Sequence, residues 1–145
     1  MRAISRKQFT TPQEAESAFY DALESLDLEA LMAVWAIDEE VICIHPNGPR
    51  LEGWEAVREG WRQILSGSAS LRIRLTDRRI YQGMLYSVHV VQELVGNPEA
   101  PTAVVATNAY LLTDGGWRMI LHHASPLPPG SSAAPAADDG VHILH

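Results

Sequence analysis

Four successive segments in the second half of the chain alternate apolar and polar residues with a period of two. Their sequences are LRIRLTDRRIY, LYSVHVVQELV, TAVVATNAYLL and WRMILHHAS. Turn residues separate them at Gln82-Gly83, at Gly96-Asn97-Pro98 and at Asp114-Gly115-Gly116. Such alternation is typical of β-strands, and short connections join strands that run antiparallel. The sequence therefore predicts an antiparallel meander of four long strands, which excludes a purely helical fold.

Helical periodicity precedes these strands. Thr11 is the predicted N-cap of a first helix, with Pro12 at its first position and Glu14 three residues after the cap. Apolar residues at helical spacing follow as far as Leu26, and a second helical stripe runs through DLEALMAVWA to Trp35. The sequence therefore predicts two packed helices that are nearly continuous along the chain.

A strand and a third helix lie between these two halves. The β-branched run from Val41 to His45 stops at Pro46 and is followed by the turn residues NGP. The segment GWEAVREGWRQILSG then carries its apolar residues on one helical face and ends at Gly67. Helices followed by a sheet predict the α+β class, in which the helices cover one sheet face.

Composition limits the domain count and the partners. A chain of 145 residues with 46% hydrophobic residues is the size of one domain, which we assign to residues 1–127. Residues 128–145 are rich in Pro, Ala, Ser and Gly, so we expect a mostly disordered tail. A net charge of −7 without a Lys/Arg cluster argues against nucleic acid or an anionic membrane as the partner. No segment has the apolar length of a membrane helix, and we expect a soluble, cytoplasmic protein.

The order of these elements, together with several local strings, resembles the NTF2-like superfamily. The strings are AFYDALESLDLEALMAVWA, IHPNGPRLEGWEAVREGW, ATNAYL and GWRMILHHASP. They are most similar to the SnoaL-like branch, which has ketosteroid isomerases and the association domain of calcium/calmodulin-dependent kinase II as relatives. The resemblance spans residues 10–127. It implies a cone in which three N-terminal helices pack on a strongly curved antiparallel sheet and enclose a pocket, while the other sheet face often pairs with a second subunit.

The resemblance to ketosteroid isomerases implies two catalytic candidates. Those enzymes place a general-base Asp directly before the Pro at the end of the short strand, where this chain has His45. An imidazole, with an ordinary pKa near 6.5, transfers protons well at neutral pH. Asn108 matches the protonated Asp that donates a hydrogen bond to the oxyanion, and an amide donates without any pKa shift. The structural alternative for His45 is a strand cap that hydrogen-bonds a nearby carbonyl.

The isomerase's second oxyanion donor, a Tyr on the first helix, aligns with Phe19, which has no donor. Tyr20 is adjacent, but neighbouring helix positions point about 100° apart, so we do not expect Tyr20 to replace it. Phe19 is instead a candidate for the pocket wall, together with six other residues. These are Trp35, Trp61, Glu93, Tyr110, Trp117 and His123.

Glu93 shares one face of its strand with His89, and the strand rise places the two about 13 Å apart. A Glu among apolar residues is either an acid with a raised pKa or a carboxylate with its own partners at the rim. His122 and His123 face opposite sides of a regular strand, and His123 shares the face of Trp117. The two histidines therefore cannot bind one metal ion together, and we expect neither a metal site nor a cofactor.

Two functions fit these observations. One is binding of a small, largely apolar molecule, with His45 as proton shuttle and Asn108 as oxyanion donor in chemistry of the isomerase, dehydratase or cyclase type. The other is non-catalytic assembly of identical chains, as in the kinase association domain. We expect a homodimer through the outer sheet face, because the strands of the meander are apolar on both faces.

Overall fold

A computed structural model describes residues 6–128 and, for the backbone alone, residues 140–143. Three helices and seven strands follow one another along these residues. They are α1 (Pro12–Glu24), α2 (Leu28–Met32), β1 (Ile42–Ile44), β2 (Arg50–Glu52), α3 (Trp54–Ser66), β3 (Ile73–Gln82), β4 (Tyr86–Val95), β5 (Thr102–Thr113), β6 (Gly116–Pro126) and β7 (Gly140–Ile143). The predicted α+β class is confirmed.

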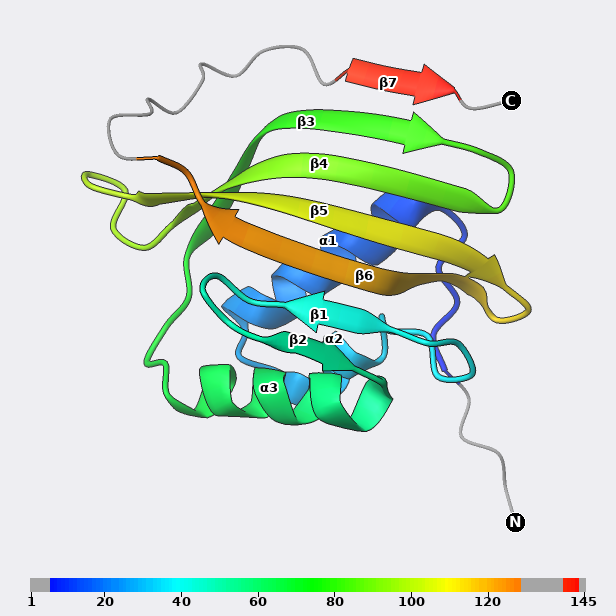
Figure 1. The fold of residues 1–145 in the computed structure, drawn as a ribbon, viewed down its shortest axis with the longest axis horizontal. Coiled ribbons are helices and arrows are strands. Elements are labelled where there is room, and N and C mark those ends of the chain that lie inside the picture. Colours follow the sequence, from blue (N-terminus) through cyan, green and yellow to red (C-terminus); the bar gives the residue numbers. More distant parts are fainter. Residues whose placement is uncertain (1–5, 129–139, 144–145) are drawn as a thin grey trace.

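The strands form one curved sheet in the order β2-β1-β6-β5-β4-β3-β7. Strands β3 to β6 pair with their neighbours in sequence and run antiparallel, which confirms the predicted meander. Strands β1 and β6 are parallel, as are β3 and β7. Figure 1 shows α1 behind the sheet and α3 beside β2, so the helices close one side of the sheet and its other face is turned to the viewer.

Helix α1 begins where the capping residues place it. The Thr11 hydroxyl accepts a hydrogen bond from the Glu14 N–H at 3.1 Å, and the Glu14 carboxylate accepts one from the Thr10 N–H at 2.8 Å. Helix α2 is shorter than the stripe predicts, because it ends at Met32 and Trp35 instead forms a parallel bridge with Met119 of β6. A tertiary contact with the sheet thus overrides the helical pattern.

Strand β6 carries one residue more than its partner. Ala109 pairs with Leu121 while Tyr110 pairs with Met119, so Ile120 forms a β-bulge. A bulge shifts the alternation of side chains by one position. His122 is therefore buried on the inner face, and His123 is exposed. The prediction that His123 shares the inner face with Trp117 is wrong, and His122 takes that place.

Two strands lie outside the predicted set. Strand β2 forms a short hairpin with β1 over the turn that begins at Pro46. Strand β7 pairs with the edge of β3 and belongs to the segment for which we expect disorder. The rest of that predicted tail, residues 129–139 and 144–145, lies outside the described residues.

The core lies between α1, α3 and the concave sheet face. Its largest fully buried side chains are Trp35, Tyr110, Phe19, Leu31, Met32 and Met119. Several polar side chains are buried with them, which is unusual because such groups cost free energy unless they are hydrogen-bonded. They are Glu16, Ser87, His89, Glu93, Asn108, Arg118 and His122.

Candidate functional site

A hollow of about 530 Å³ lies between α3 and the β1–β2 hairpin, and His45 is part of its wall. We call it the His45 hollow. It is lined by His45, Gly48, Pro49, Leu51, Ala56, Glu59, Gly60, Gln63 and Ile64. Apolar surface predominates in this lining. The hollow therefore combines an apolar wall with one imidazole, the composition expected of a small-molecule site.

The imidazole of His45 is fixed by its neighbours. Its ring lies edge-on to Trp61, with the ring centroids 4.5 Å apart, and its Nε2 lies 3.6 Å from the Cys43 sulfur. Gly60 on α3 faces the ring, and a Cβ at that position would lie 3.4 Å from Nε2, at van der Waals contact. Burial lowers the pKa of His45, so the neutral base is its form at pH 7.

Neither Cys43, which lies behind His45, nor Glu59, which lines the hollow, is available as a base or nucleophile. Burial raises the pKa of the Cys43 thiol to about 12, which keeps it protonated. Glu59 on the rim accepts hydrogen bonds from Arg62, which lower its pKa to about 2. His45 is thus the titratable group of this lining that can accept a proton at neutral pH.

Trp61 connects the His45 hollow to the interior. Its ring centroid lies 5.5 Å from that of His122 and 5.6 Å from that of Phe19. The indole Nε1 of Trp61 is buried and has no hydrogen-bond partner among the described residues. A buried donor without a partner carries a free-energy cost that an acceptor atom from a ligand or water would remove.

A chain of four polar side chains runs inward from His122. The His122 Nδ1–H donates to Asn108 Oδ1 at 2.6 Å, and the Asn108 amide donates to the Tyr20 hydroxyl at 2.9 Å. The Tyr20 hydroxyl in turn donates to Glu93 Oε2 at 2.6 Å. Every donor in this chain points toward Glu93, so the carboxylate is the terminal acceptor.

A second polar cluster surrounds Glu16 on α1. Its carboxylate accepts hydrogen bonds from the His89 Nδ1–H at 2.8 Å, from Arg78 at 3.0 Å and from the Tyr110 hydroxyl at 3.2 Å. Burial alone would raise the pKa of Glu16, but the hydrogen bond from His89 and the charges of His89 and Arg78 outweigh it and lower that pKa. Glu16 is therefore a buried, paired carboxylate.

Burial controls the other pKa values of the interior. It raises the pKa of Glu93 against the opposing hydrogen bond from Tyr20, and it raises the pKa of Tyr20 well above the ordinary value. It also lowers the pKa of His122 to about 3, with help from the charges of His45 and His123. Both the imidazole and the phenol are thus neutral at pH 7.

A family model described as the SnoaL-like domain matches residues 13–129, which is most of the chain. The chain belongs to the SnoaL-like domain family. Its NTF2-like fold is shared by many solved structures.

Two solved structures illustrate the similarity. One is from Thiobacillus denitrificans and is a proposed calcium/calmodulin-dependent protein kinase type II association domain. Its sequence is 40% identical, the match covers 83% of this chain and 98% of that chain, and the TM-score is 0.77. The other is a proposed dehydratase of the NTF2-like family from Streptomyces avermitilis. Its sequence is 28% identical, the match covers 80% of this chain and 93% of that chain, and the TM-score is 0.73.

A curated relative, the F-box protein SKIP8 of Arabidopsis thaliana, is 25% identical over 121 residues. The match covers 74% of this SnoaL-like chain and 46% of SKIP8, so the chain spans less than half the length of that relative.

The structure brings some of the predicted site residues of this SnoaL-like domain together and separates others. His45 lines the His45 hollow, whereas Phe19 and Trp61 are buried outside its lining, with Trp61 in ring contact with both Phe19 and His45. Asn108 lies deeper, where its amide is already bonded to Tyr20 and His122, and Glu93 and Tyr110 belong to the two polar clusters. Trp35 and Trp117 are buried in the core, and exposed His123 lies on the outer face.

Sequence reasoning missed three polar residues of this SnoaL-like interior: Tyr20, Glu16 and His122. We do not expect Tyr20 to replace the isomerase's donor, but the structure buries Tyr20 beside Phe19, with ring centroids 4.9 Å apart, and its hydroxyl accepts a hydrogen bond from Asn108. A signal was present, because Glu16 and Tyr20 are four residues apart on α1 and therefore share a helix face.

The SnoaL-like chain offers no evident place for a metal ion in its described part. No group of three or more His, Cys, Asp or Glu side chains there is arranged to hold one. None of the helices described is long and apolar enough to span a bilayer.

Proposed function

We propose that the protein binds a small, largely apolar molecule in the His45 hollow and that His45 transfers a proton to or from it. The observation that supports this most is the position of His45. It is a neutral, partly buried imidazole in the wall of an apolar hollow, held edge-on against the ring of Trp61. A neutral base in an apolar wall suits proton removal next to a carbonyl group.

In the proposed step, the unprotonated ring nitrogen of His45 accepts a proton from the carbon beside the ligand's carbonyl. The electron pair of that C–H bond moves to form an enolate. The imidazolium then returns the proton to carbon. Asn108 takes no direct part, because Tyr20 and His122 already engage its amide.

The test uses 2-tetralone, an apolar bicyclic ketone, as the probe. Exchange of its α-protons with D₂O is followed by ¹H NMR with the wild-type protein, with His45→Gln and with His123→Gln, whose imidazole is exposed. General base catalysis is typically worth about 100-fold or more. We expect exchange above the buffer rate with the wild type and with His123→Gln, and exchange at the buffer rate with His45→Gln.

Binding is measured separately with 2-naphthol, a stable analogue of the enol. Saturable binding of 2-naphthol without ketone exchange would leave a binding protein and refute the proton transfer. Absence of both would refute the proposed use of this hollow.

A second function, assembly of identical chains, is supported by the similarity to the proposed association domain from Thiobacillus denitrificans. The outer sheet face offers an apolar surface for such a contact. Its partly buried members include Val88, Val90, Val105, Ala109, Leu111 and Leu121. We propose that a second copy of this chain covers this face, and a monomeric mass in solution would contradict that proposal.

A further inference from the structure

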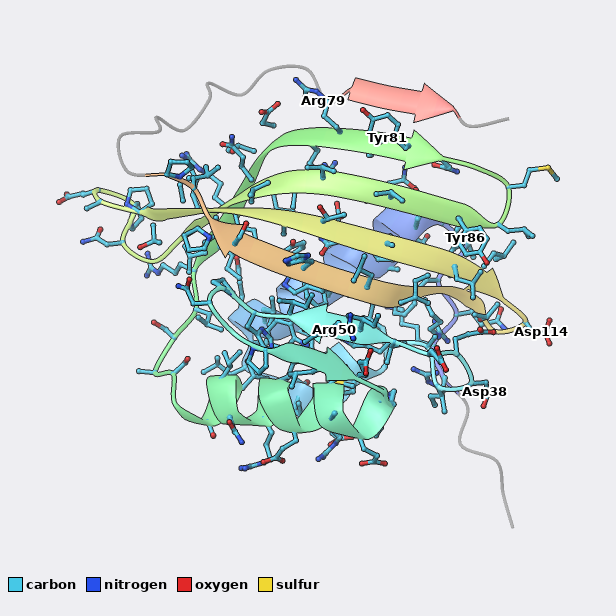
Figure 2. All side chains as sticks on the ribbon, viewed as in Figure 1. Asp38, Arg50, Arg79, Tyr81, Tyr86 and Asp114 are labelled. Carbon is cyan, nitrogen blue, oxygen red and sulfur yellow. The ribbon has the colours of Figure 1, made fainter. Side chains whose placement is uncertain are left out.

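A larger hollow, of about 740 Å³, lies at the other end of β1 from His45. We call it the Arg–acid hollow. It is lined by Arg6, Gln8, Ala36, Ile37, Asp38, Glu39, Leu112, Thr113, Asp114, Gly115 and Arg118. Figure 2 shows Asp38 and Asp114 at the same end of the molecule, beside the turn between β5 and β6. Nothing in the function proposed above uses this hollow.

Two guanidinium groups are held in place at this hollow by backbone carbonyl groups. Arg6 donates to the carbonyl oxygens of Ala33 at 2.7 Å and Trp35 at 2.8 Å. Arg118 donates to the carbonyl oxygen of Lys7, and its guanidinium lies 5.0 Å from the centroid of the Phe9 ring. Both cations are thus ordered before any ligand arrives, which reduces the entropy lost on binding.

The two cations lie close enough to affect each other. Burial lowers the pKa of Arg118, and the charge of Arg6 lowers it further. Neither arginine forms an ion pair with an acidic side chain in the part of the chain that the structure describes. An anionic group in the hollow would therefore gain attraction from two cations that no described carboxylate contacts.

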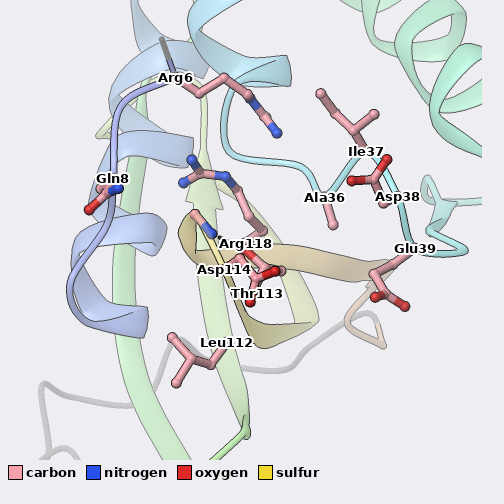
Figure 3. Close-up of a pocket in the computed structure, with 11 residues that line it drawn as sticks. Arg6, Gln8, Ala36, Ile37, Asp38, Glu39, Leu112, Thr113, Asp114 and Arg118 are labelled. Carbon is pink, nitrogen blue, oxygen red and sulfur yellow. Dashed lines mark hydrogen bonds between the residues drawn. The ribbon is translucent and has the colours of Figure 1, made fainter.

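Carboxylates line the same hollow without forming an ion pair with either arginine, although the charge of Asp38 acts to raise the pKa of Arg6. Figure 3 shows Asp38 and Glu39 on the segment before β1 and Asp114 on the β5–β6 turn, while Arg6 and Arg118 project from other elements. All three carboxylates are exposed. A ligand that fits must present a cation to the acidic side and an anion to the arginines.

Apolar surface adjoins both sets of charges. Ile37 is 51% exposed and Leu112 is 40% exposed, and both belong to the lining. Large apolar side chains left in water at a hollow are covered favourably by an apolar part of a ligand.

We propose that the Arg–acid hollow binds a small zwitterion of the α-amino-acid class with an apolar side chain. The ligand carboxylate contacts Arg6, and Arg118, which is 2% exposed, adds a second positive charge behind it. The ligand's ammonium contacts Asp38 or Asp114, and its side chain covers Ile37 and Leu112. A simple anion leaves the carboxylates without a partner, and a simple cation leaves the arginines without one. The proposal is independent of the function proposed for His45.

The test compares three probes that differ chiefly in charge: L-leucine, N-acetyl-L-leucine without the cation, and L-leucinamide without the anion. Each is titrated into the ¹⁵N-labelled full chain, and the amide resonances of Leu112 and Gly115 are followed. We expect saturable shifts with L-leucine and affinity weaker by about tenfold or more for each analogue, because each lacks one charge-assisted contact. No saturable shift with L-leucine, or equal affinity for all three probes, would overturn the proposal.

Variants assign the binding to this hollow. The double variant Asp38→Asn/Asp114→Asn removes two exposed charges. It should weaken the binding of L-leucine about tenfold and leave the affinity for N-acetyl-L-leucine unchanged. The matched control is Glu55→Gln, which removes an exposed carboxylate at the start of α3 and should change neither affinity. His45→Gln should keep L-leucine affinity. L-leucine binding that survives the double variant, or that His45→Gln removes, would contradict the assignment.

Discussion

Tyr20 satisfies two buried polar groups at once, since its hydroxyl donates to Glu93 and accepts from Asn108. Neither the Glu93 carboxylate nor the Asn108 amide nitrogen has another hydrogen-bond partner in the described part of the chain. Replacing Tyr20 with Phe keeps the ring and removes only the shared oxygen atom.

We predict that Tyr20→Phe lowers the free energy of unfolding by about 2 kcal/mol, because it leaves a buried donor and a buried acceptor unsatisfied. Urea denaturation at pH 7 measures the loss. Tyr86→Phe is the control, since the Tyr86 side chain is 54% exposed, and it should be neutral within about 0.5 kcal/mol. Equal stability of the two variants would mean that the Tyr20 hydroxyl adds nothing to the fold.

His122 makes stability depend on pH. Its folded-state pKa of about 3 lies below the ordinary value of 6.5, so the unfolded chain binds the proton more tightly than the folded one. The stability associated with neutral His122 is complete above pH 6.5 and decreases as the pH falls from 6.5 toward 3. Between pH 7 and pH 5 we predict a loss of about 2 kcal/mol from this residue.

The check is urea denaturation at pH 7 and pH 5 for three proteins. His122→Gln keeps an N–H donor for Asn108 but does not titrate, so it should lose about 2 kcal/mol less than the wild type over this range. Tyr86→Phe, which alters an exposed side chain that is not among the causes of the His122 shift, should behave like the wild type. The idea fails if His122→Gln and the wild type have the same pH dependence.

Residue roles that follow from a period or a cap were predictable, while roles that depend on tertiary contact were not. The Thr11 cap and the shared face of His89 and Glu93 follow from local sequence, and both are confirmed. The partners of these residues are not local, because Glu93 meets Tyr20 across 73 positions of sequence. No rule of spacing within one element identifies such a pair.

At the scale of elements, residues 6–10, which we call the N-terminal arm, can pack against β6 only because β6 has a glycine at position 116. Gly116 has φ of +102°, and a Cβ there would lie 2.7 Å from the carbonyl oxygen of Phe9. The Trp117 N–H donates to that same oxygen at 2.9 Å. The absent side chain is what lets the arm approach the strand.

We predict that Gly116→Ala is more destabilising than Gly96→Ala. Gly96 has φ of +95°, but a Cβ added there would have no atom within 4 Å, so its variant carries only backbone strain of about 1–2 kcal/mol. Gly116→Ala adds a clash with backbone and should free the arm, so that trypsin cleaves faster after Arg6 and Lys7. Equal cleavage rates in the two variants would contradict the clash.

Gly60 on α3 tests the His45 hollow without a large change in stability. Alanine in a helix interior is favoured over glycine by about 1 kcal/mol. The new Cβ would lie 2.5 Å from the movable Leu51 Cδ1 and 3.4 Å from His45 Nε2. We predict that Gly60→Ala unfolds at the same urea concentration as the wild type or a higher one, but binds 2-naphthol more weakly; unchanged 2-naphthol affinity would count against this hollow.

At the scale of the whole molecule, the fold could be predicted because the four long strands set it. The meander and the three helices follow from periodicity, and the cone follows from the family resemblance. Strand β2 has three residues and strand β7 four, too few to show a pattern. The Arg–acid hollow could not be predicted either, since Arg6, Asp38 and Arg118 come from three distant segments.

The proposed dimer through the outer sheet face can be tested at this scale. Val90→Lys puts a charge in the middle of that face and should reduce the mass in solution from a dimer to a monomer, measured by light scattering after size exclusion. Met84→Lys is the control, because Met84 lies in the β3–β4 turn and is 88% exposed. A dimer that persists in Val90→Lys would place the contact elsewhere.

The extra residue in β6 has a consequence for transferring residue roles between relatives. From Leu121 to the end of the strand, each side chain is one step out of phase with the segment before Ile120. A relative without that insertion would present opposite surfaces in the same alignment columns, so two histidines in one column need not share an environment. Residue roles should therefore be transferred between relatives separately for the parts of β6 before and after position 120.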